Sequence, residues 1–98
     1  MEVEFVDNDL DKMETDAKFT GGYGEAVVRG FRKCMFVIRS AVDERDLYSM
    51  RSLNFEQLKG SRKHQHSVRI NKQWRLILEL KRVGPEKTVV VISIEDYH

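Results

Sequence analysis

The sequence contains a single cysteine and a single proline, and no apolar run approaches the roughly 18 residues that a membrane-spanning helix requires. The one cysteine, Cys34, excludes an internal disulfide and fits a reducing compartment. Residues 1–5 are acidic and lack the basic and apolar regions of a signal peptide. We therefore expect a cytoplasmic protein that does not associate with membranes. Its 98 residues suffice for one domain, 1–98, with a single modest core.

The sequence also has little net charge, +1 at pH 7, but its charges are unevenly distributed. Residues 1–20 contain seven acidic and two basic side chains, whereas residues 51–82 contain nine basic and two acidic ones. A basic region of this kind favours contact with a polyanion, most often nucleic acid, and the acidic start is expected to face elsewhere. A solvated surface with an uneven charge distribution explains the same counts equally well.

Hydrophobic spacing predicts the elements of the first half of the chain. Alternating polar and apolar residues indicate a short strand over 2–6, and residues 9–13 are expected to form a short helix with Asp9 as its N-cap. Three glycines within 20–24 predict a loop. A long helix is predicted from Glu25, because apolar residues recur at helical spacing and form a stripe that we expect to face the core. This stripe consists of Val27, Val28, Phe31, Cys34, Met35, Ile38, Ala41 and Val42.

The second half of the chain is predicted to be mainly strand. Residues 43–54 have no clear period and are expected to be turn or short helix. Three alternating or apolar runs then follow, separated by short turns, and such an order predicts an antiparallel meander. The long helix must cover one face of this sheet, so the fold class is α+β. The predicted strands are 64–70, 74–81 and 88–94, with turns at 71–73 and 84–85.

Three separated blocks in this half resemble a known family. In order and in approximate spacing they are similar to the HigB branch of the RelE-like toxins, also called plasmid maintenance killer proteins. The resemblance is close over residues 58–98, and upstream it rests on the order of the elements. The blocks are Leu58-Lys59-Gly60-Ser61-Arg62, then residues 66–75, then Glu95-Asp96-Tyr97-His98.

The resemblance implies a RelE-like fold, with a short N-terminal strand and helices packed on a curved antiparallel sheet that ends in a three-strand meander. It also implies a ribosome-dependent messenger-RNA endonuclease that acts without a metal or cofactor. The implied partners are the ribosome, messenger RNA and a HigA-like antitoxin with a helix-turn-helix domain, through which the complex binds operator DNA. Matching positions assign the active site to Lys59, Arg75, Asp96, Tyr97 and His98. Some members carry a histidine where this chain has Glu56, which makes Glu56 a possible residue at the edge of the site.

These residue types suit RNA cleavage. A ribose 2′-OH can attack the adjacent phosphate if it loses its proton, if charge on the phosphorane is stabilised and if the leaving 5′-oxygen is protonated. Lys59 and Arg75 suit the phosphorane, since the guanidinium fork can bind two oxygens. Tyr97 is suited to stacking or hydrogen bonding, and His98 to proton transfer near neutral pH. Further basic side chains are expected to contact RNA or the ribosome: Arg51, Arg62, Lys63, Arg69, Lys72, Lys81 and Arg82.

Several of these residues also have purely structural interpretations. Arg75 can pair with Glu79 on the same strand face, and Trp74 is expected to be a core anchor rather than a stacking platform. His64 and His66 share a strand face but have no cysteine or acidic ligand in register, so we predict no metal site. Cys34 is interpreted as a small buried hydrophobe rather than a nucleophile. Two other functions remain open: a catalytically inactive RelE-fold protein that only binds its partner, and a basic RNA-binding module.

Overall fold

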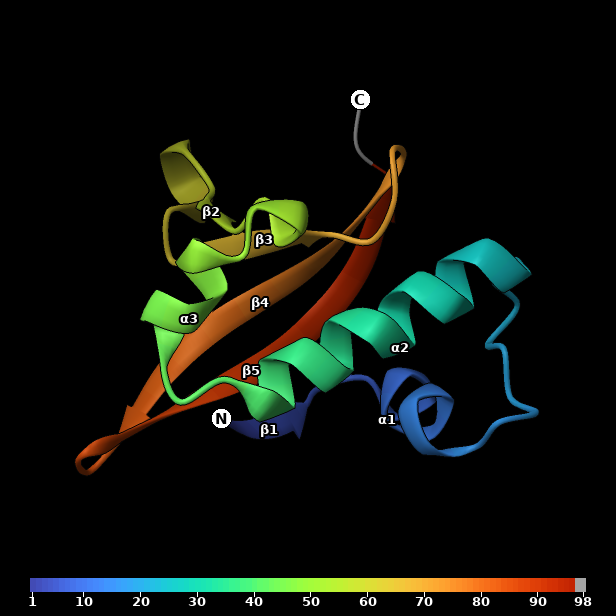
Figure 1. Ribbon diagram of the computed structural model, residues 1–98, viewed down its shortest axis with the longest axis horizontal. Helices are drawn as coiled ribbons and strands as arrows, with labels where there is room; N and C mark the ends of the chain where they lie inside the picture. Colours follow the sequence, from blue (N-terminus) through green and yellow to red (C-terminus); the bar gives the residue numbers. More distant parts are fainter. Residues whose placement is uncertain (97–98) are drawn as a thin grey trace.

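The computed structural model describes residues 1–96 as a five-stranded sheet with helices on one face (Figure 1). The strands lie in the order β1-β5-β4-β3-β2 and are β1 (Glu2–Phe5), β2 (Glu56–Gln57), β3 (Gln65–Arg69), β4 (Trp74–Val83) and β5 (Glu86–Asp96). The helices are α1 (Asn8–Thr15), α2 (Glu25–Ser40) and α3 (Glu44–Ser49), with two single 3-10 turns, η1 (Arg51–Leu53) and η2 (Gly60–Arg62). The predicted α+β class is confirmed. None of the helices in the described chain has the length and apolar character needed to cross a membrane.

Strands β3, β4 and β5 form the predicted antiparallel meander, with β4 in the centre of the sheet. At one end of the β4–β5 pair Trp74 is opposite Asp96, and at the other end Val83 is opposite Glu86. Two pairings were not predicted. β1 runs parallel to the first part of β5, and the two-residue β2 pairs with β3. A strand of two residues is too short to give a periodic signal in the sequence.

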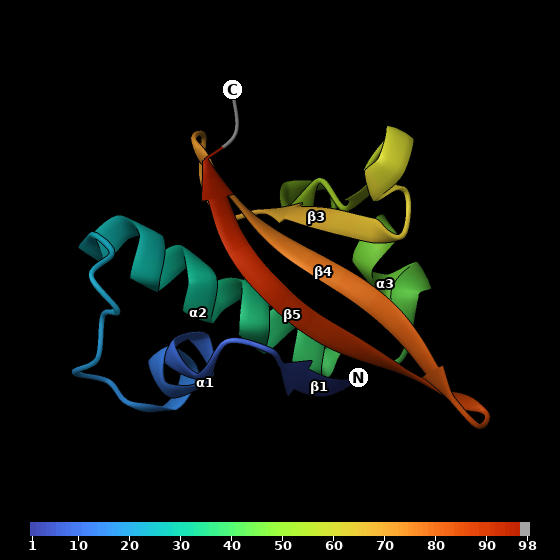
Figure 2. The same cartoon turned by 180° about the vertical axis from the view of Figure 1, so that it is seen from behind.

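The core lies between α2 and one face of the sheet, as Figures 1 and 2 show from opposite sides. Phe31, Met35 and Ile38 of α2 are fully buried against side chains such as Leu76 and Leu78 of β4. In Figure 2 strands β3, β4 and β5 lie in front of the helices, so the opposite face of the sheet is the one seen. We call this the open face. Because side chains alternate along a strand, residues next to the core positions of β4 point to the open face.

A bulge in β5 changes which of its residues face the core. Ser93 pairs with Ile77, but the next pair joins Val91 to Leu78, so Ile92 is an additional residue in β5. The additional residue lets Val91 and Ile94 both face the core although three positions separate them. Beyond the bulge, Ser93 and Glu95 therefore lie on the open face.

Two details of the helices differ from the sequence predictions. The N-cap of α1 is Asp7 rather than Asp9, two residues earlier than predicted, and the Asp7 carboxylate accepts from the Asp9 backbone N–H at 2.8 Å. Val42 was placed in the core stripe, but α2 ends at Ser40 and the Val42 side chain is 84% exposed. Once the backbone leaves helical geometry, the helical spacing no longer places a residue on the stripe.

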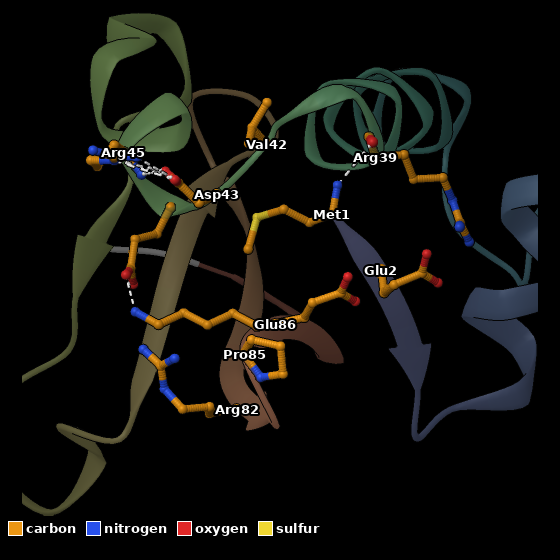
Figure 3. A pocket seen from close by; sticks show the side chains of 11 residues that line it. Met1, Glu2, Arg39, Val42, Asp43, Arg45, Arg82, Pro85 and Glu86 are labelled. Atoms are coloured by element: carbon orange, nitrogen blue, oxygen red, sulfur yellow. Dashed lines mark hydrogen bonds and ion pairs between the residues drawn. The ribbon is translucent and has the colours of Figure 1, made fainter.

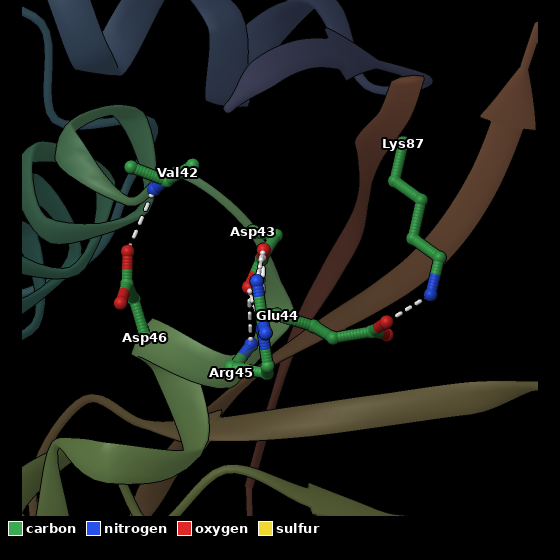
Figure 4. Close-up of polar contacts among 6 residues, drawn as sticks. All are labelled: Val42, Asp43, Glu44, Arg45, Asp46 and Lys87. Carbon is green, nitrogen blue, oxygen red and sulfur yellow. Dashed lines mark hydrogen bonds and ion pairs between the residues drawn. The ribbon is translucent and has the colours of Figure 1, made fainter. Parts of the chain in front are cut away.

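The end of α2 is held by other parts of the chain. The α-ammonium group of Met1 donates to the backbone carbonyl of Arg39 at 3.0 Å (Figure 3). It also donates to the carbonyls of Ile38, at 3.3 Å, and Ala41. Beyond the helix, the Val42 N–H donates to the Asp46 carboxylate, and Glu44 of α3 pairs with Lys87 of β5 (Figure 4). These contacts join α2 and α3 to the end of the sheet that lies away from Asp96.

Candidate active site

Arg75 is the second residue of β4 and projects on the open face, because Trp74 and Leu76 on either side of it pack toward the core. Its side chain is only 5% exposed, and its Nη2 donates to Oε1 of Glu56 at 2.8 Å. Glu56 lies on β2, and β3 runs between β2 and β4, so this ion pair connects the edge of the sheet to its centre. Glu56 is 45% exposed, which leaves its carboxylate accessible from solvent.

The sequence allowed an ion pair between Arg75 and Glu79, but the structure pairs Arg75 with Glu56. Arg75 does not pair with Glu79. The Glu79 carboxylate instead accepts from Gln65 at 3.1 Å and lies 3.9 Å from the imidazole of His64. A buried guanidinium needs a partner to offset the cost of its desolvation, and β2 supplies that partner. Glu56, the possible site-edge residue that the resemblance indicated, is therefore in direct contact with Arg75.

Lys59 is three residues after Glu56 and precedes η2, for which it is the N-terminal flanking residue. The Leu58 N–H donates to the Gln65 carbonyl at 2.9 Å, so the β2–β3 pairing continues up to Lys59. Gly60 then has φ +67°, a left-handed conformation that other residues rarely adopt. This turn leaves the Lys59 side chain exposed at the end of the β2–β3 pair.

Asp96 is the last described residue and ends β5 opposite Trp74. Its Oδ2 accepts from Nε2 of Gln73 at 3.2 Å, and Gln73 immediately precedes β4. The start of β4, which carries Arg75, and the end of β5 therefore lie at the same end of the sheet, which we call the Arg75 end. The predicted site residues Tyr97 and His98 lie outside the described residues.

The predicted basic residues do not form one continuous surface. Arg69 and Lys72 line a small pocket of about 180 Å³ together with Arg75. Arg62 of η2 makes two hydrogen bonds to the Glu95 carboxylate, at 2.8 and 3.0 Å, which raise the pKa of Arg62 and lower that of Glu95. Lys63 is exposed directly after η2, and Arg51 is exposed in η1.

Two more of these basic residues lie at the far end of β4. Lys81 is six residues from Arg75, about 20 Å along the strand, and its Nζ is 3.8 Å from the Glu4 carboxylate. Arg82 lines a pocket of about 610 Å³ with residues of both charges, among them Glu2 and Arg39 (Figure 3). The acidic residues of β1 pair with the first part of β5, so they lie toward the end of the sheet that is away from Arg75.

A family model, the RelE-like toxin of the type II toxin–antitoxin system HigB, matches residues 3–98. The chain belongs to this family. It is a toxin of the RelE/HigB type, and a toxin–antitoxin system implies an antitoxin as its partner.

Three solved structures share the RelE-like fold with this toxin. A YoeB/ParE toxin from Agrobacterium tumefaciens has a TM-score of 0.63 and 24% identity, with 100% of each chain covered. YafQ from E. coli strain BL21(DE3) has a TM-score of 0.59 and 13% identity, and the match covers 97% of this chain and 91% of that one. The conserved hypothetical protein HP0894 from Helicobacter pylori has a TM-score of 0.53 and 13% identity, with 99% and 94% covered. A comparison with curated protein sequences gives no significant match.

His66 and Cys34 belong to the side of the sheet that faces the core. His66 stacks on Phe55 with ring centroids 4.8 Å apart, and burial lowers the pKa of His66 below its ordinary value. Cys34 is buried beneath the sheet, which raises its pKa to about 11, so it is a poor nucleophile. Within residues 1–96, no three His, Cys, Asp or Glu side chains are grouped closely enough to hold a metal ion.

Two residues that lie beside Arg75, Asn54 and Asn71, were not predicted from the sequence to belong to the site. Asn54 follows η1 with φ +46°, and it lines the small pocket beside Arg75. Asn71, predicted only to be in a turn, uses its Oδ1 to accept from the N–H groups of Gln73 and Trp74, both at 2.9 Å. Asparagine is common in left-handed conformations and in turns, so neither residue stands out in the sequence as part of a site.

Proposed function

We propose that this toxin is a ribosome-dependent messenger-RNA endonuclease that promotes attack of a ribose 2′-OH on the adjacent phosphate. The observation that best supports the proposal is the buried Arg75, held by Glu56 on the open face at the edge where β5 ends. A guanidinium fixed before substrate binds stabilises a phosphorane without first having to reorganise. Lys59, on the adjoining turn, supplies a second positive charge.

The cleavage requires two proton transfers. The 2′-oxygen loses its proton as it bonds to phosphorus, and the bond between phosphorus and the 5′-oxygen breaks as that oxygen gains a proton. The products are a 2′,3′-cyclic phosphate and a 5′-hydroxyl, and the sequence of steps needs no metal or cofactor. Arg75 and Lys59 stabilise the phosphorane, Asp96, Tyr97 and His98 complete the site, and His98 is the residue suited to exchange a proton near pH 7.

In this proposal Glu56 is a positioning residue, since it contacts Arg75 rather than the RNA. Replacement by glutamine keeps a hydrogen-bond acceptor but removes the charge. We expect Glu56→Gln to lower kcat while changing KM little, because Arg75 acts mainly in the transition state. A histidine at this position, as in Glu56→His, tests whether the residue found in other family members restores activity.

The partners follow from the same proposal. The basic residues around the site, Arg51, Arg62, Lys63, Arg69 and Lys72, contact ribosomal RNA or messenger RNA in the cytoplasm, and Lys81 and Arg82 make a separate contact at the far end of β4. Such binding weakens steeply with salt. A HigA-like antitoxin neutralises the toxin and connects the complex to operator DNA through its helix-turn-helix domain.

Inducible expression of the intact chain, with mapping of messenger-RNA ends, tests the proposal. We expect growth arrest and new 5′-hydroxyl ends in translated transcripts. A Lys59→Ala variant that also lacks His98 should leave the transcripts intact, whereas Lys33→Ala, an exposed lysine of α2, should behave as the intact chain.

Stable transcripts and normal growth with the intact chain would contradict the nuclease. Antitoxin binding without cleavage would then favour the inactive partner-binding protein. Salt-sensitive RNA binding that survives loss of Tyr97 and His98 would favour the basic RNA-binding module.

A further inference from the structure

Among the residues that the structure describes, those that line the small pocket next to Arg75 are arginine, lysine and asparagine, and each has N–H groups that can donate hydrogen bonds. It has a volume of about 180 Å³ and lies between Asn54 and the turn that connects β3 to β4. Within residues 1–96, no carboxylate lines it. Its lining residues are Asn54, Arg69, Asn71, Lys72 and Arg75.

The contacts of these residues leave donors available to a ligand. Asn71 uses its Oδ1 for the N–H groups of Gln73 and Trp74, so its Nδ2 group remains as a donor. Arg69 donates to the Asn71 carbonyl at 3.3 Å through Nε alone. In the part of the chain that the structure describes, neither the Nη groups of Arg69 nor the Nζ of Lys72 has a hydrogen-bond or ion-pair partner.

The pocket brings positively charged side chains close together. Arg69 and Arg75 are directly opposite each other on β3 and β4, and like charges at such cross-strand positions repel. Other basic side chains are paired with acids: Arg39 contacts Glu14, and Arg62 contacts Glu95. Glu56 compensates Arg75 but lies on the β2 side of it, so the charges of Arg69 and Lys72 remain to be balanced.

We propose that this pocket binds a backbone phosphate of the RNA substrate, next to the phosphate that is cleaved. The inference rests on the proposed function, because it takes RNA as the substrate, and it adds a second anchoring point to the site. Arg75 lines the pocket and also belongs to the candidate active site, so the two phosphates are neighbours along one strand. The pocket is smaller than the roughly 300–1,000 Å³ sites that enclose whole small molecules. It therefore suits a phosphate group, which positions the strand without reading its sequence.

The test compares two double variants, one that removes two positive charges from the pocket and a control that removes two from another surface. The pocket variant is Arg69→Gln with Lys72→Gln, and the control is Arg29→Gln with Lys33→Gln on the exposed side of α2. The probe is a short single-stranded oligoribonucleotide with 2′-O-methyl groups, which cannot be cleaved by 2′-OH attack. Binding is followed by the fluorescence of Trp74, which lies directly after the pocket turn.

We expect the pocket variant to bind the probe at least tenfold more weakly, and the control to stay within twofold of the intact toxin. The slope of log K against log salt should fall by about 0.7 in the pocket variant, the value for one lost phosphate contact on a single strand. Thermal unfolding of both variants verifies that they are folded. Equal weakening in both variants, or none in either, would overturn the proposal, because the binding would then depend on overall charge or on other residues.

Cleavage assays on ribosomes separate this inference from the proposed function. If the intact toxin cuts and the pocket variant cuts with an unchanged KM, the pocket is not a substrate site although the nuclease stands. If the intact toxin binds the probe through the pocket but cuts no RNA, the phosphate site stands and the nuclease does not.

Discussion

Replacing Gly30 by alanine should destabilise the toxin, although alanine is the better helix former. Gly30 lies in the middle of α2, where its backbone approaches the residue just before the pocket turn. A β-carbon at position 30 would lie 2.7 Å from Cγ2 of Ile70 and 2.8 Å from its carbonyl oxygen. Real β-carbons do not approach other atoms so closely, and the carbonyl belongs to the backbone, so α2 or the turn must move.

Helix propensity and the steric contact with Ile70 have opposite effects on the free energy of unfolding. Alanine in place of glycine stabilises a helix interior by about 1 kcal/mol. Forcing an extra methyl group into a packed contact costs about 1–3 kcal/mol. We expect the contact to dominate and Gly30→Ala to lower the free energy of unfolding by about 1 kcal/mol, which corresponds to a Tm lower by roughly 4–8 °C for a domain of this size.

Urea and thermal unfolding measure this change, and Arg29 supplies the control. Arg29 is exposed in the same helix, so the difference between Arg29→Ala and Arg29→Gly isolates the helix-propensity term, with loss of its contact to Glu25 common to both. If Gly30→Ala were more stable than the intact toxin by this same difference, the close approach of α2 to Ile70 would be refuted. The variant should also weaken binding of the oligonucleotide probe, since Ile70 adjoins Asn71.

Three further outcomes are expected. Cys34 should react with a thiol reagent at pH 8 only when the toxin unfolds, because its buried thiol has a pKa of about 11; rapid labelling of the folded protein would contradict this. His66 has a lowered pKa, so the unfolded chain binds a proton more readily and the free energy of unfolding should fall as pH drops below 6.5; His66→Phe should flatten this part of the pH profile of urea unfolding. Arg62→Gln should raise the pKa of Glu95, measured by NMR titration, but change stability by less than about 1 kcal/mol, since both side chains are well exposed; an unchanged Glu95 pKa would show that the pair does not form.

The elements with long periodic signals were predictable. The stripe of α2 and the three strands of the meander follow from spacing alone, because many residues contribute to each pattern. The exceptions lie where few residues carry the signal. Val42 has the right spacing for the core, but the position at which the helix ends depends on contacts with Met1, which is distant in sequence. The parallel pairing of β1 with β5 likewise joins the two ends of the chain, and local patterns contain no information on such pairings.

The residues of the candidate site were proposed from the family resemblance, but the contacts among them could not be predicted from the sequence. Family resemblance indicated Lys59, Arg75 and Glu56 as separate positions. It did not indicate that Glu56 contacts Arg75, because this contact depends on β2, whose pairing with β3 has no sequence signature. The pocket beside Arg75 was missed for a similar reason: Asn54 and Lys72 come together only when the turn after β3 approaches η1.

The bulge at Ile92 determines the side of the molecule to which the last residues of β5 are presented. If β5 kept Ile92 but alternated regularly from Val91 onward, Glu95 would turn inward toward the helices and Ile94 outward into water. Arg62 would then lose its carboxylate partner, and the core would receive a charge. Deleting Ile92 should instead keep Ile94 in the core and Glu95 beside Arg62, because Val91 and Ile94 would then be two positions apart.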